Sequence, residues 1–287
     1  MAIKKICIVT GASSGIGKAT AMLLSKMQFS VILVARDYDR GWKVLKEIEM
    51  VSGNKKNDLM IVDLSNLQSV YSLINQIKAT YKQLHLLVNC AGAAFRERQL
   101  SVDKFEMTFA TNHLGPFLLT TGLLNMLINS APSRIVNVAS EAHRPNQIDF
   151  NDLMWDRKKY IGYAGDIFQP TAYGQSKLAN IMFTYELARK LAETGVNANC
   201  LHPGFVATNF CKNNKDPLNI LFSILKPFRI SPEKSARSII KLCTSEDFSG
   251  VTGKYFNIER MMPSSPFSYG KEDSKRLWRI CEKMSSE

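Results

Sequence analysis

The chain has 287 residues, of which 45% are hydrophobic, so a disordered protein is excluded and one large domain is allowed. The net charge is +12, but the basic residues are dispersed, which argues against a nucleic-acid-binding protein. No run of about 18 apolar residues is present, so we expect no membrane-spanning helix.

The cysteines and histidines form no metal-binding pattern. The six cysteines contain no C-x-x-C pair, and the four histidines are far apart. We therefore expect no metal, and a cytoplasmic protein without a signal peptide or membrane anchor, with peripheral membrane contact as the alternative. Cys90 and Cys211 are expected to be inert. His113 is expected to be structural, His202 to pack near a strand end, and His143 to contact substrate or lie in a surface loop.

Strand and helix patterns alternate along most of the chain. Strands are predicted over residues 3–9, 30–35, 59–62, 84–89, 133–139, 196–201 and 253–256. Helices are predicted from residue 16, over 38–50, 67–81, 102–128 and 172–194, from residue 232, and around 277–284. This alternation predicts an α/β fold: a Rossmann-type, doubly wound parallel sheet of about seven strands with helices on both faces.

No convincing linker or repeat divides the chain, so we expect a single domain over residues 1–287. Within it, residues 205–230 are expected to form a substrate lid and residues 257–287 a C-terminal tail. Ser65 is expected to cap the helix that starts at residue 67, and Ser231, followed by Pro232, to cap a later one. Ligands of such sheets bind at the carboxyl ends of the strands, where the polar clusters of this sequence fall.

A glycine-rich turn follows the first strand. The stretch 10–17 reads Gly-x-x-x-Gly-x-Gly between a strand and a helix, and its candidate ligand-binding residues are Gly11, Ser13, Ser14, Gly15, Ile16 and Gly17. Glycines let the backbone turn sharply and let a phosphate approach closely. The free N–H groups and positive dipole end of the helix can then hold a pyrophosphate. The alternative is a plain strand-to-helix turn with a serine cap.

Arg36 directly follows the second strand, where an NAD-binding protein carries an acidic residue for the ribose 2′-hydroxyl. A guanidinium at this place can bind a 2′-phosphate bidentately. The next residue, Asp37, is expected to point away or to cap the following helix. Arg36 therefore predicts NADP(H) as the cofactor.

Tyr173 and Lys177 lie four residues apart on one predicted helix face. A free tyrosine is a poor acid–base catalyst at neutral pH, but a nearby ammonium favours the phenolate and lowers the tyrosine pKa. Such a pair can donate a proton to a carbonyl oxygen or accept one from an alcohol.

Together these motifs resemble the short-chain dehydrogenase/reductase family. The resemblance is carried by residues 10–17, 89–92, 112, 140, 173, 177, 203–204 and 208, in this order along the chain. Residues 112–120, 140–143, 176–180 and 201–204 are most similar to its NADP-dependent retinol dehydrogenase-like group. Protochlorophyllide reductases and other carbonyl reductases are similar in these stretches and remain alternatives.

The resemblance implies four catalytic roles. Tyr173 would be the acid–base, and Lys177 would lower its pKa and hold the nicotinamide ribose. Ser140 would hydrogen-bond the substrate oxygen. Asn112 would open its helix locally and hold a water in the proton relay.

The resemblance also implies a cofactor site. Asp63 and Leu64 would frame the adenine, and Asn89, Ala91 and Gly92 would line the path of the ribose and nicotinamide. The remaining implied cofactor residues follow the sixth strand, and Thr208 among them would hold the carboxamide: Pro203, Gly204, Val206 and Thr208. Cys90 stands where the family usually has asparagine, and we expect little effect of this change.

These features predict an NADP(H)-dependent oxidoreductase that reduces a lipophilic, retinal-like aldehyde or ketone, or oxidises the corresponding alcohol. We expect a monomer or homodimer. One alternative is a catalytically silent, cofactor-sensing scaffold, and another is a lipid-binding membrane-surface protein. The apolar run 218–225 is expected to be a lid, a membrane-dipping helix or core.

Overall fold

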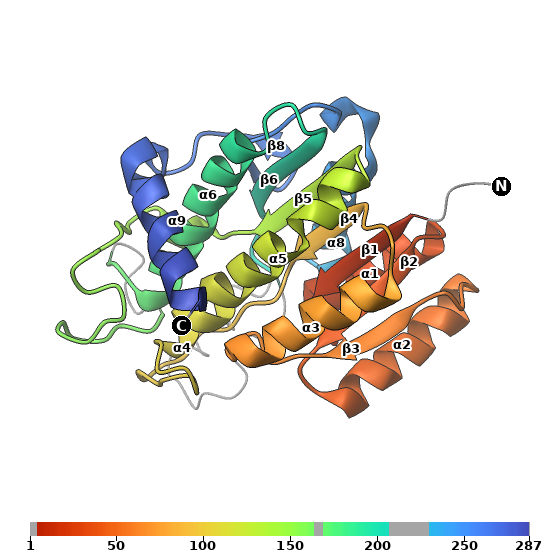
Figure 1. Cartoon of the computed structure of the whole chain (residues 1–287), viewed down its shortest axis with the longest axis horizontal. Helices are drawn as coiled ribbons and strands as arrows, with labels where there is room; N and C mark the ends of the chain where they lie inside the picture. The colour runs from red at the N-terminus through yellow and green to blue at the C-terminus, as the bar shows by residue number, and fades with distance from the viewer. Residues whose placement is uncertain (1–4, 164–168, 207–229, 287) are drawn as a thin grey trace.

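The computed structural model describes residues 5–163, 169–206 and 230–286. Its centre is an eight-stranded sheet in the order β3-β2-β1-β4-β5-β6-β7-β8 (Figure 1). The strands are β1 (Ile6–Thr10), β2 (Ser30–Ala35), β3 (Asp58–Ile61), β4 (Leu86–Asn89), β5 (Ser133–Val138), β6 (Val196–His202), β7 (Tyr255–Asn257) and β8 (Arg260–Met261). The first seven strands run parallel, whereas β8 turns back antiparallel on β7 and adds a strand to the predicted number.

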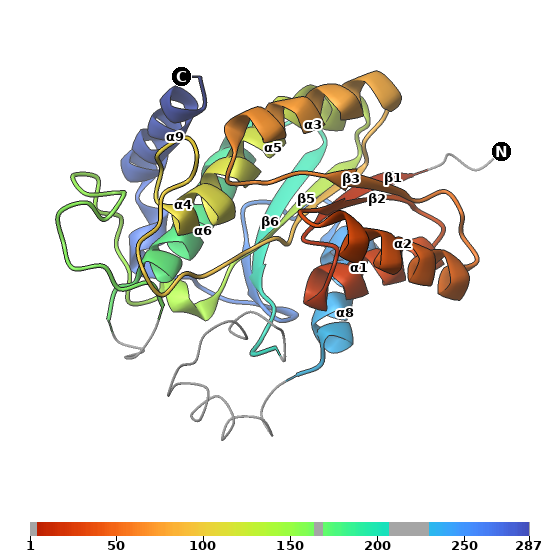
Figure 2. The ribbon, with the colours of Figure 1, turned by 90° about the horizontal axis from the view of Figure 1, so that it is seen from below.

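Helices cover both faces of the sheet, which confirms the predicted α/β fold (Figure 2). One face carries α1 (Gly15–Lys26), α2 (Tyr38–Ser52) and α8 (Pro232–Thr244). The other face carries α3 (Leu67–Thr80), α4 (Met107–Phe109), α5 (Gly115–Asn129), α6 (Ala172–Lys190) and α9 (Lys271–Ser286). The strand order reverses between β1 and β4, the point at which such sheets bind their ligands.

The sheet separates two hydrophobic clusters. On β1, Cys7 and Val9 pack into the cluster with residues of α1, α2 and α8, whereas Ile8 packs into the opposite cluster with residues of α3, α5 and α6. Successive strand residues face opposite sides, so apolar side chains at every position of a central strand imply burial on both faces.

The helix caps follow local chemistry. Ser231 caps α8 as predicted, accepting a hydrogen bond from the backbone N–H of Lys234. The predicted cap at Ser65 is wrong, because Asn66 caps α3 by accepting from the N–H of Ser69. The Ser65 hydroxyl instead donates to the Asp63 carboxylate at 2.7 Å.

The single long helix predicted over residues 102–128 is also wrong. Residues Leu100 and Glu106 pair in a β-bridge, and the Glu106 carboxylate accepts from the N–H groups of Thr108 and Phe109, so the helix begins only at Met107. Ala110–Leu114 then form a π-helical turn before α5 begins.

Helix α9 is longer than the predicted 277–284, and it packs on the sheet's helical layer. Its Trp278 ring lies 5.0 Å from the Phe117 ring and 5.5 Å from the Phe183 ring, centroid to centroid. Trp278 is buried, as are Leu277 and Cys281 on the same helix. This contact ties the C-terminal residues to α5 and α6.

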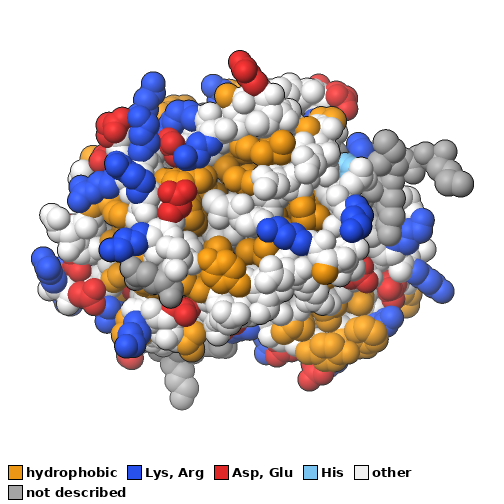
Figure 3. Space-filling model, in the orientation of Figure 1, with side chains coloured by type: hydrophobic (Ala, Val, Ile, Leu, Met, Phe, Trp, Pro, Cys, Tyr) orange, Lys and Arg blue, Asp and Glu red, His pale blue; other side chains and the backbone are white. Residues whose placement is uncertain are grey.

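The surface is mixed in character. On the face drawn in Figure 3, Lys and Arg side chains are scattered among acidic and apolar ones rather than gathered in a stripe. Within the described ranges, no helix combines the length and apolarity needed to cross a membrane. Most of the predicted lid, including residues 218–225, lies outside the described residues, as do Thr208 and Cys211.

Candidate active site

The glycine turn lies tightly against the end of β4. Gly11 has φ +67°, and a Cβ built on it would be 2.8 Å from the Cα of Ala91. A Cβ on Gly17 would be 2.3 Å from the Gly11 carbonyl oxygen. Only glycine allows this approach of α1, the turn and Ala91. The turn therefore brings Ala91 close to the start of α1. A ligand bound at the helix start could then contact both elements.

The N-terminus of α1 has no side-chain cap. Ser14 occupies the N-cap position in extended backbone, but its hydroxyl makes no capping hydrogen bond. No acidic residue lies in the first turn of the helix. The first backbone N–H groups of the helix therefore have no side-chain acceptor, and they belong to a stretch that includes Ser13, Gly15 and Ile16. A helix start of this kind can bind a phosphate group.

Backbone hydrogen bonds align the ends of β1, β2 and β3 along one edge. The N–H of Ala12 donates to the carbonyl of Val34, and the N–H of Val62 donates to the carbonyl of Ala35. Arg36 and Asp63, each one residue further along, consequently lie at the same edge of the sheet as the glycine turn. The alignment thus brings these two predicted cofactor residues to the carboxyl ends of the strands on one side of the switch point.

Arg36 and Asp37 have different environments. Arg36 is exposed, and no ion pair holds its guanidinium among residues 5–163, 169–206 and 230–286. Asp37 caps α2, because its carboxylate accepts from the N–H of Arg40 at 2.9 Å. This confirms the expectation that Asp37 caps the helix.

Asp63 and Leu64 form the next part of the edge. The Asp63 carboxylate accepts from the N–H and the hydroxyl of Ser65, so one of its oxygens is already engaged. Leu64 is buried, and a Cβ on Gly115 would be only 2.1 Å from the Leu64 carbonyl oxygen. Gly115 therefore allows the start of α5 to pack on Leu64.

The side chain of Asn89 is bound in the core, and the lining of the cofactor path by residue 89 stays a prediction. It is buried and donates to Thr120 Oγ1 at 2.9 Å and to Asn137 Oδ1 at 2.8 Å. An asparagine at the end of a buried strand can bond in either direction, and here the polar groups of α5 and β5 bind it in the core. Its neighbours Ala91 and Gly92 lie beside Gly11 and beside Lys177 and Asn112, respectively.

Asn112 lies in the π-helical turn between α4 and α5. Its Oδ1 accepts from the N–H of Ala93 at 2.7 Å, and its Nδ2 donates to the Ala93 carbonyl at 2.8 Å and to Ser176 Oγ at 3.0 Å. The local opening of the helix turns the amide toward the loop after β4. Such turns occur at functional sites more often than in ordinary helices.

Lys177 is buried at the centre of the predicted catalytic group. Its Nζ donates to the Val138 carbonyl at 3.0 Å and lies 5.5 Å from the centroid of the Tyr173 ring. A Cβ on Gly92 would be 3.3 Å from this Nζ and 3.6 Å from Asn112 Oδ1. Both polar groups thus lie close to Gly92, where a side chain would crowd them.

Burial lowers the pKa of Lys177 to about 8, because the ammonium loses hydration. The side chain is still mostly protonated at neutral pH. It therefore places a positive charge near the half-buried Tyr173, where that charge favours the phenolate.

Ser140 lies two residues beyond the carbonyl that Lys177 binds. Its Oγ accepts a hydrogen bond from the N–H of Ala142 at 3.2 Å. This bond uses a lone pair of the oxygen and leaves the hydroxyl proton for another acceptor. The Lys177 contacts with Val138 and the Tyr173 ring thus place the start of α6 beside the end of β5, two residues before Ser140.

The described residues directly after β6 contact α8 and Ile230. The Pro203 carbonyl accepts from Ser235 Oγ at 2.7 Å, and Gly204 has φ +86° with Ile230 packed against it. Val206 pairs with Ile230 in an isolated parallel bridge. The bridge fixes the two described ends of the predicted lid beside each other.

A family model described as short chain dehydrogenase matches residues 5–150 and 164–219. The chain belongs to this family. It is 39% identical over 280 residues to mouse retinol dehydrogenase 13, covering 96% of this chain and 81% of that protein. It is 36% identical over 279 residues to mouse retinol dehydrogenase 12, covering 97% and 85%. A crystal structure of a protein from Mycobacterium Paratuberculosis is similar with TM-score 0.77 and 27% identity, covering 98% and 93%.

As a short-chain dehydrogenase, the protein is an oxidoreductase that acts on CH–OH groups with NAD(P)(H). The described residues contain no group of three His, Cys, Asp or Glu side chains that could hold a metal. Cys90 does not interfere with Lys177, because burial raises the pKa of its thiol to about 12 despite the nearby ammonium.

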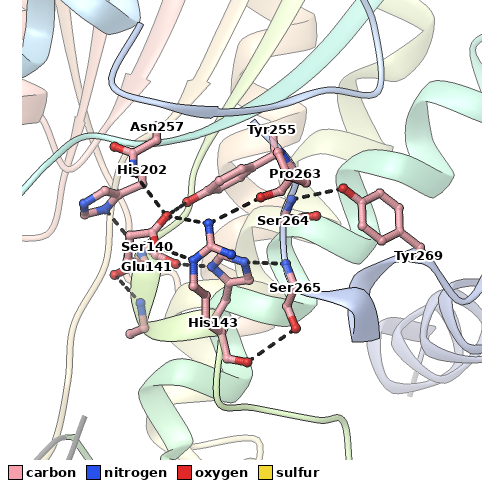
Figure 4. A network of polar contacts seen from close by, with 12 residues as sticks. Ser140, Glu141, His143, His202, Tyr255, Asn257, Pro263, Ser264, Ser265 and Tyr269 are labelled. Atoms are coloured by element: carbon pink, nitrogen blue, oxygen red, sulfur yellow. Dashed lines mark hydrogen bonds and ion pairs between the residues drawn. The ribbon is translucent and has the colours of Figure 1, made fainter. Parts of the chain in front are cut away.

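The sequence did not reveal a polar network behind Ser140 (Figure 4). His143 is fully buried rather than in a surface loop, and its ring bonds the carbonyl of Ser140 and the N–H of Ser265. Glu141 accepts from the Tyr255 hydroxyl at 2.5 Å, and its own N–H donates to His202 Nδ1 at 3.3 Å. A histidine three residues after Ser140 was the only sequence signal for this network.

Asn146 holds the turn that carries Ser140 against α6. Asn146 Nδ2 donates to the Ala142 carbonyl at 2.7 Å, and its Oδ1 accepts from the N–H of Thr171, the N-cap of α6, at 2.9 Å. A Cβ on Gly174 would be 2.1 Å from Asn146 Nδ2. Glycine next to Tyr173 therefore lets the turn and the helix approach each other.

Proposed function

We propose that this short-chain dehydrogenase uses NADP(H) to reduce a lipophilic aldehyde or ketone, or to oxidise the corresponding alcohol. One observation carries the proposal: buried Lys177 lies beside Tyr173 and the end of β5, with Gly92 and Asn112 close by. A buried ammonium next to a phenol is an arrangement for moving a proton at neutral pH.

The chain's own residues handle the substrate oxygen. The Ser140 hydroxyl donates a hydrogen bond to it, and the Tyr173 hydroxyl transfers a proton to it during reduction. Lys177 stabilises the phenolate that this transfer leaves. Asn112 Oδ1 keeps a second acceptor site for the water of the relay, since Ala93 occupies only one.

NADP(H), when bound, supplies or takes up the hydride. The residues fit this cofactor: the uncapped start of α1 for its pyrophosphate, Arg36 for its 2′-phosphate, and Lys177 Nζ beside Gly92 for its nicotinamide ribose. Asp63, Leu64 and Ala91 would border it, and so would Pro203, Gly204 and Val206 after β6, with Thr208 following. The preference for NADP(H) rests on Arg36, which no acidic partner neutralises in the described ranges.

The similarity to retinol dehydrogenases 12 and 13 supports an apolar carbonyl compound of the retinal type as substrate. It also supports all-trans-retinal as the first compound to assay, followed by shorter apolar aldehydes and ketones.

Substitution of Tyr173 by Phe tests the activity. We expect NADPH-dependent reduction of retinal to fall at least about a hundredfold, because the proton donor is lost. NADPH affinity should change less than about twofold, since Phe keeps the ring beside Lys177. Full turnover by Tyr173→Phe would contradict the proposal. Absence of turnover by the wild type with intact NADPH binding would favour the scaffold alternative.

A further inference from the structure

The turn that carries Ser140 is held from two sides. On one side Asn146 joins it to the start of α6, next to Tyr173. On the other side it meets a C-terminal anchor, which we define as Tyr255, Asn257, Pro263 and Ser265 (Figure 4). These residues are remote in sequence, but β7 pairs with β6 and β6 with β5, so β7 and the residues after it reach the turn that follows β5.

His143 links the anchor to Ser140 directly. Its Nε2 lies 2.9 Å from the N–H of Ser265, and its Nδ1 lies 2.6 Å from the Ser140 carbonyl oxygen. A backbone N–H can only donate and a carbonyl can only accept. These two partners therefore assign a neutral imidazole with its proton on Nδ1, donated to the Ser140 carbonyl.

Glu141 makes the second link. Its carboxylate accepts from the Tyr255 hydroxyl at 2.5 Å, from Asn257 Nδ2 at 3.4 Å and from Arg144. Arg144 in turn donates to the Pro263 carbonyl at 3.3 Å. Burial alone would raise the pKa of Glu141, but the hydrogen bonds from Arg144 and Tyr255 outweigh it and lower the pKa, so the side chain is a carboxylate at neutral pH.

The rotation of the Ser140 hydroxyl depends on the backbone of this turn. Its Oγ accepts from the N–H of Ala142, which lies between the two linked residues Glu141 and His143. A shift of the turn would therefore reorient the hydroxyl that faces the substrate oxygen.

We propose that His143 is a positioning residue, which transmits the position of the C-terminal anchor to Ser140 and so sets the hydrogen bond that Ser140 gives to the substrate oxygen. This inference rests on the proposed function, in which Ser140 binds that oxygen. His143 itself is fully buried, and it acts on the substrate oxygen only through Ser140.

A double-mutant cycle on the full chain tests this coupling, with His143→Phe, Ser140→Ala and the double variant. The assay is NADPH-dependent reduction of retinal, with kcat and KM determined separately. We expect His143→Phe to lower kcat about tenfold, with NADPH affinity within about twofold of the wild type. In the Ser140→Ala background, the same substitution should lower kcat less than about twofold, because the side chain that it positions is gone.

The same tenfold loss in both backgrounds would overturn the inference, since it would mean a general structural role. Turnover at the wild-type level in Ser140→Ala would instead overturn the proposed role of Ser140, and the inference with it. The two failures are thus distinguishable.

His143→Asn provides the conservative variant, and it replaces His143→Phe in the cycle if the latter does not fold. An asparagine Nδ2 can take the place of the imidazole Nδ1 and donate to the Ser140 carbonyl. We expect it to retain more kcat than His143→Phe, and equal loss in both would count against the inference. Ser264→Ala is the matched control, because Ser264 is buried in the same segment but bonds Tyr185 and Ser268. It should leave kcat unchanged, and a loss equal to that of His143→Phe would again contradict the inference.

Discussion

The two halves of the site are built differently. On the cofactor side, the turn, the cap and Arg36 are short stretches whose geometry follows from the residues themselves, as in Gly11 at φ +67° and the Asp37 cap. On the carbonyl side, the turn that carries Ser140 depends on long-range contacts, such as the one between His143 and Ser265, 122 positions apart. The first half thus combines local turn and cap geometry with a contact to Ala91, whereas the second is set mainly by tertiary packing.

This difference bears on how each half can fail. A change in a local turn should abolish ligand binding at that turn and leave the remote network intact. A change in the network should leave cofactor affinity intact and alter the chemical step. The predictions below separate these two outcomes.

The largest effect is expected for Gly17→Ala. Alanine in place of glycine normally stabilises a helix by about 0.5–1 kcal/mol. Here its Cβ would be 2.3 Å from the Gly11 carbonyl oxygen, and Gly11 is itself packed on Ala91. The turn must shift, so we expect NADPH affinity measured by fluorescence titration to fall at least about a hundredfold.

Gly53→Ala is the control for that substitution. Gly53, at the end of α2, has φ +68°, unlike Gly17, and no atom lies within 4 Å of its hypothetical Cβ. It should cost about 1 kcal/mol in the free energy of unfolding through backbone strain alone and leave NADPH affinity unchanged. Equal NADPH affinity in Gly17→Ala and Gly53→Ala would show that the turn is not the binding site.

A smaller effect, on stability, is expected at the carbonyl side from His113, next to Asn112. Burial lowers its pKa to about 4, despite a 2.9 Å hydrogen bond between Nδ1 and Asn180 Oδ1. The native state therefore binds fewer protons than the unfolded state between about pH 6.5 and pH 4. The free energy of unfolding should fall as the pH drops through this window, by about 2 kcal/mol at pH 5 for this group.

His113→Phe removes the titrating group and fits among Phe109, Phe117 and Phe183. Denaturant unfolding at pH 7 and pH 5 checks the prediction. Between pH 7 and pH 5, the free energy of unfolding of the variant should fall by about 2 kcal/mol less than that of the wild type, whatever the stability of the variant at pH 7. An identical loss in both proteins would assign the acid sensitivity to other groups, such as His202, whose pKa burial also lowers to about 4.

The sequence predicted the parallel sheet and the glycine turn, because continuous apolar strands and fixed spacings encode them locally. The joint role of Ser140, Tyr173 and Lys177 followed from the family resemblance instead. It did not predict where the helix before Asn112 begins, since Glu106 caps that helix through its own side chain. The core position of the Asn89 side chain depends on partners from α5 and β5.

The His143 network was not predicted from the sequence for the same reason as the core position of Asn89, because its partners are distant in the chain. A lone histidine in a polar loop gives no sign of burial, and its partner Ser265 enters the site only through β7 and the residues after it. Long-range partners of this kind leave no periodicity in the sequence.

The most direct test of the account is cofactor selectivity, measured as the affinities of NADPH and NADH for the wild type, Arg36→Ala and Asp37→Ala. We expect NADPH to bind the wild type at least about tenfold more tightly, and Arg36→Ala to erase the difference, because the guanidinium binds the 2′-phosphate. Asp37→Ala should keep the preference and lose only about 1 kcal/mol of stability, as a lost helix cap. If NADH binds the wild type equally well, and Asp37→Ala weakens it, then Asp37 binds the ribose and the account of the cofactor site is contradicted.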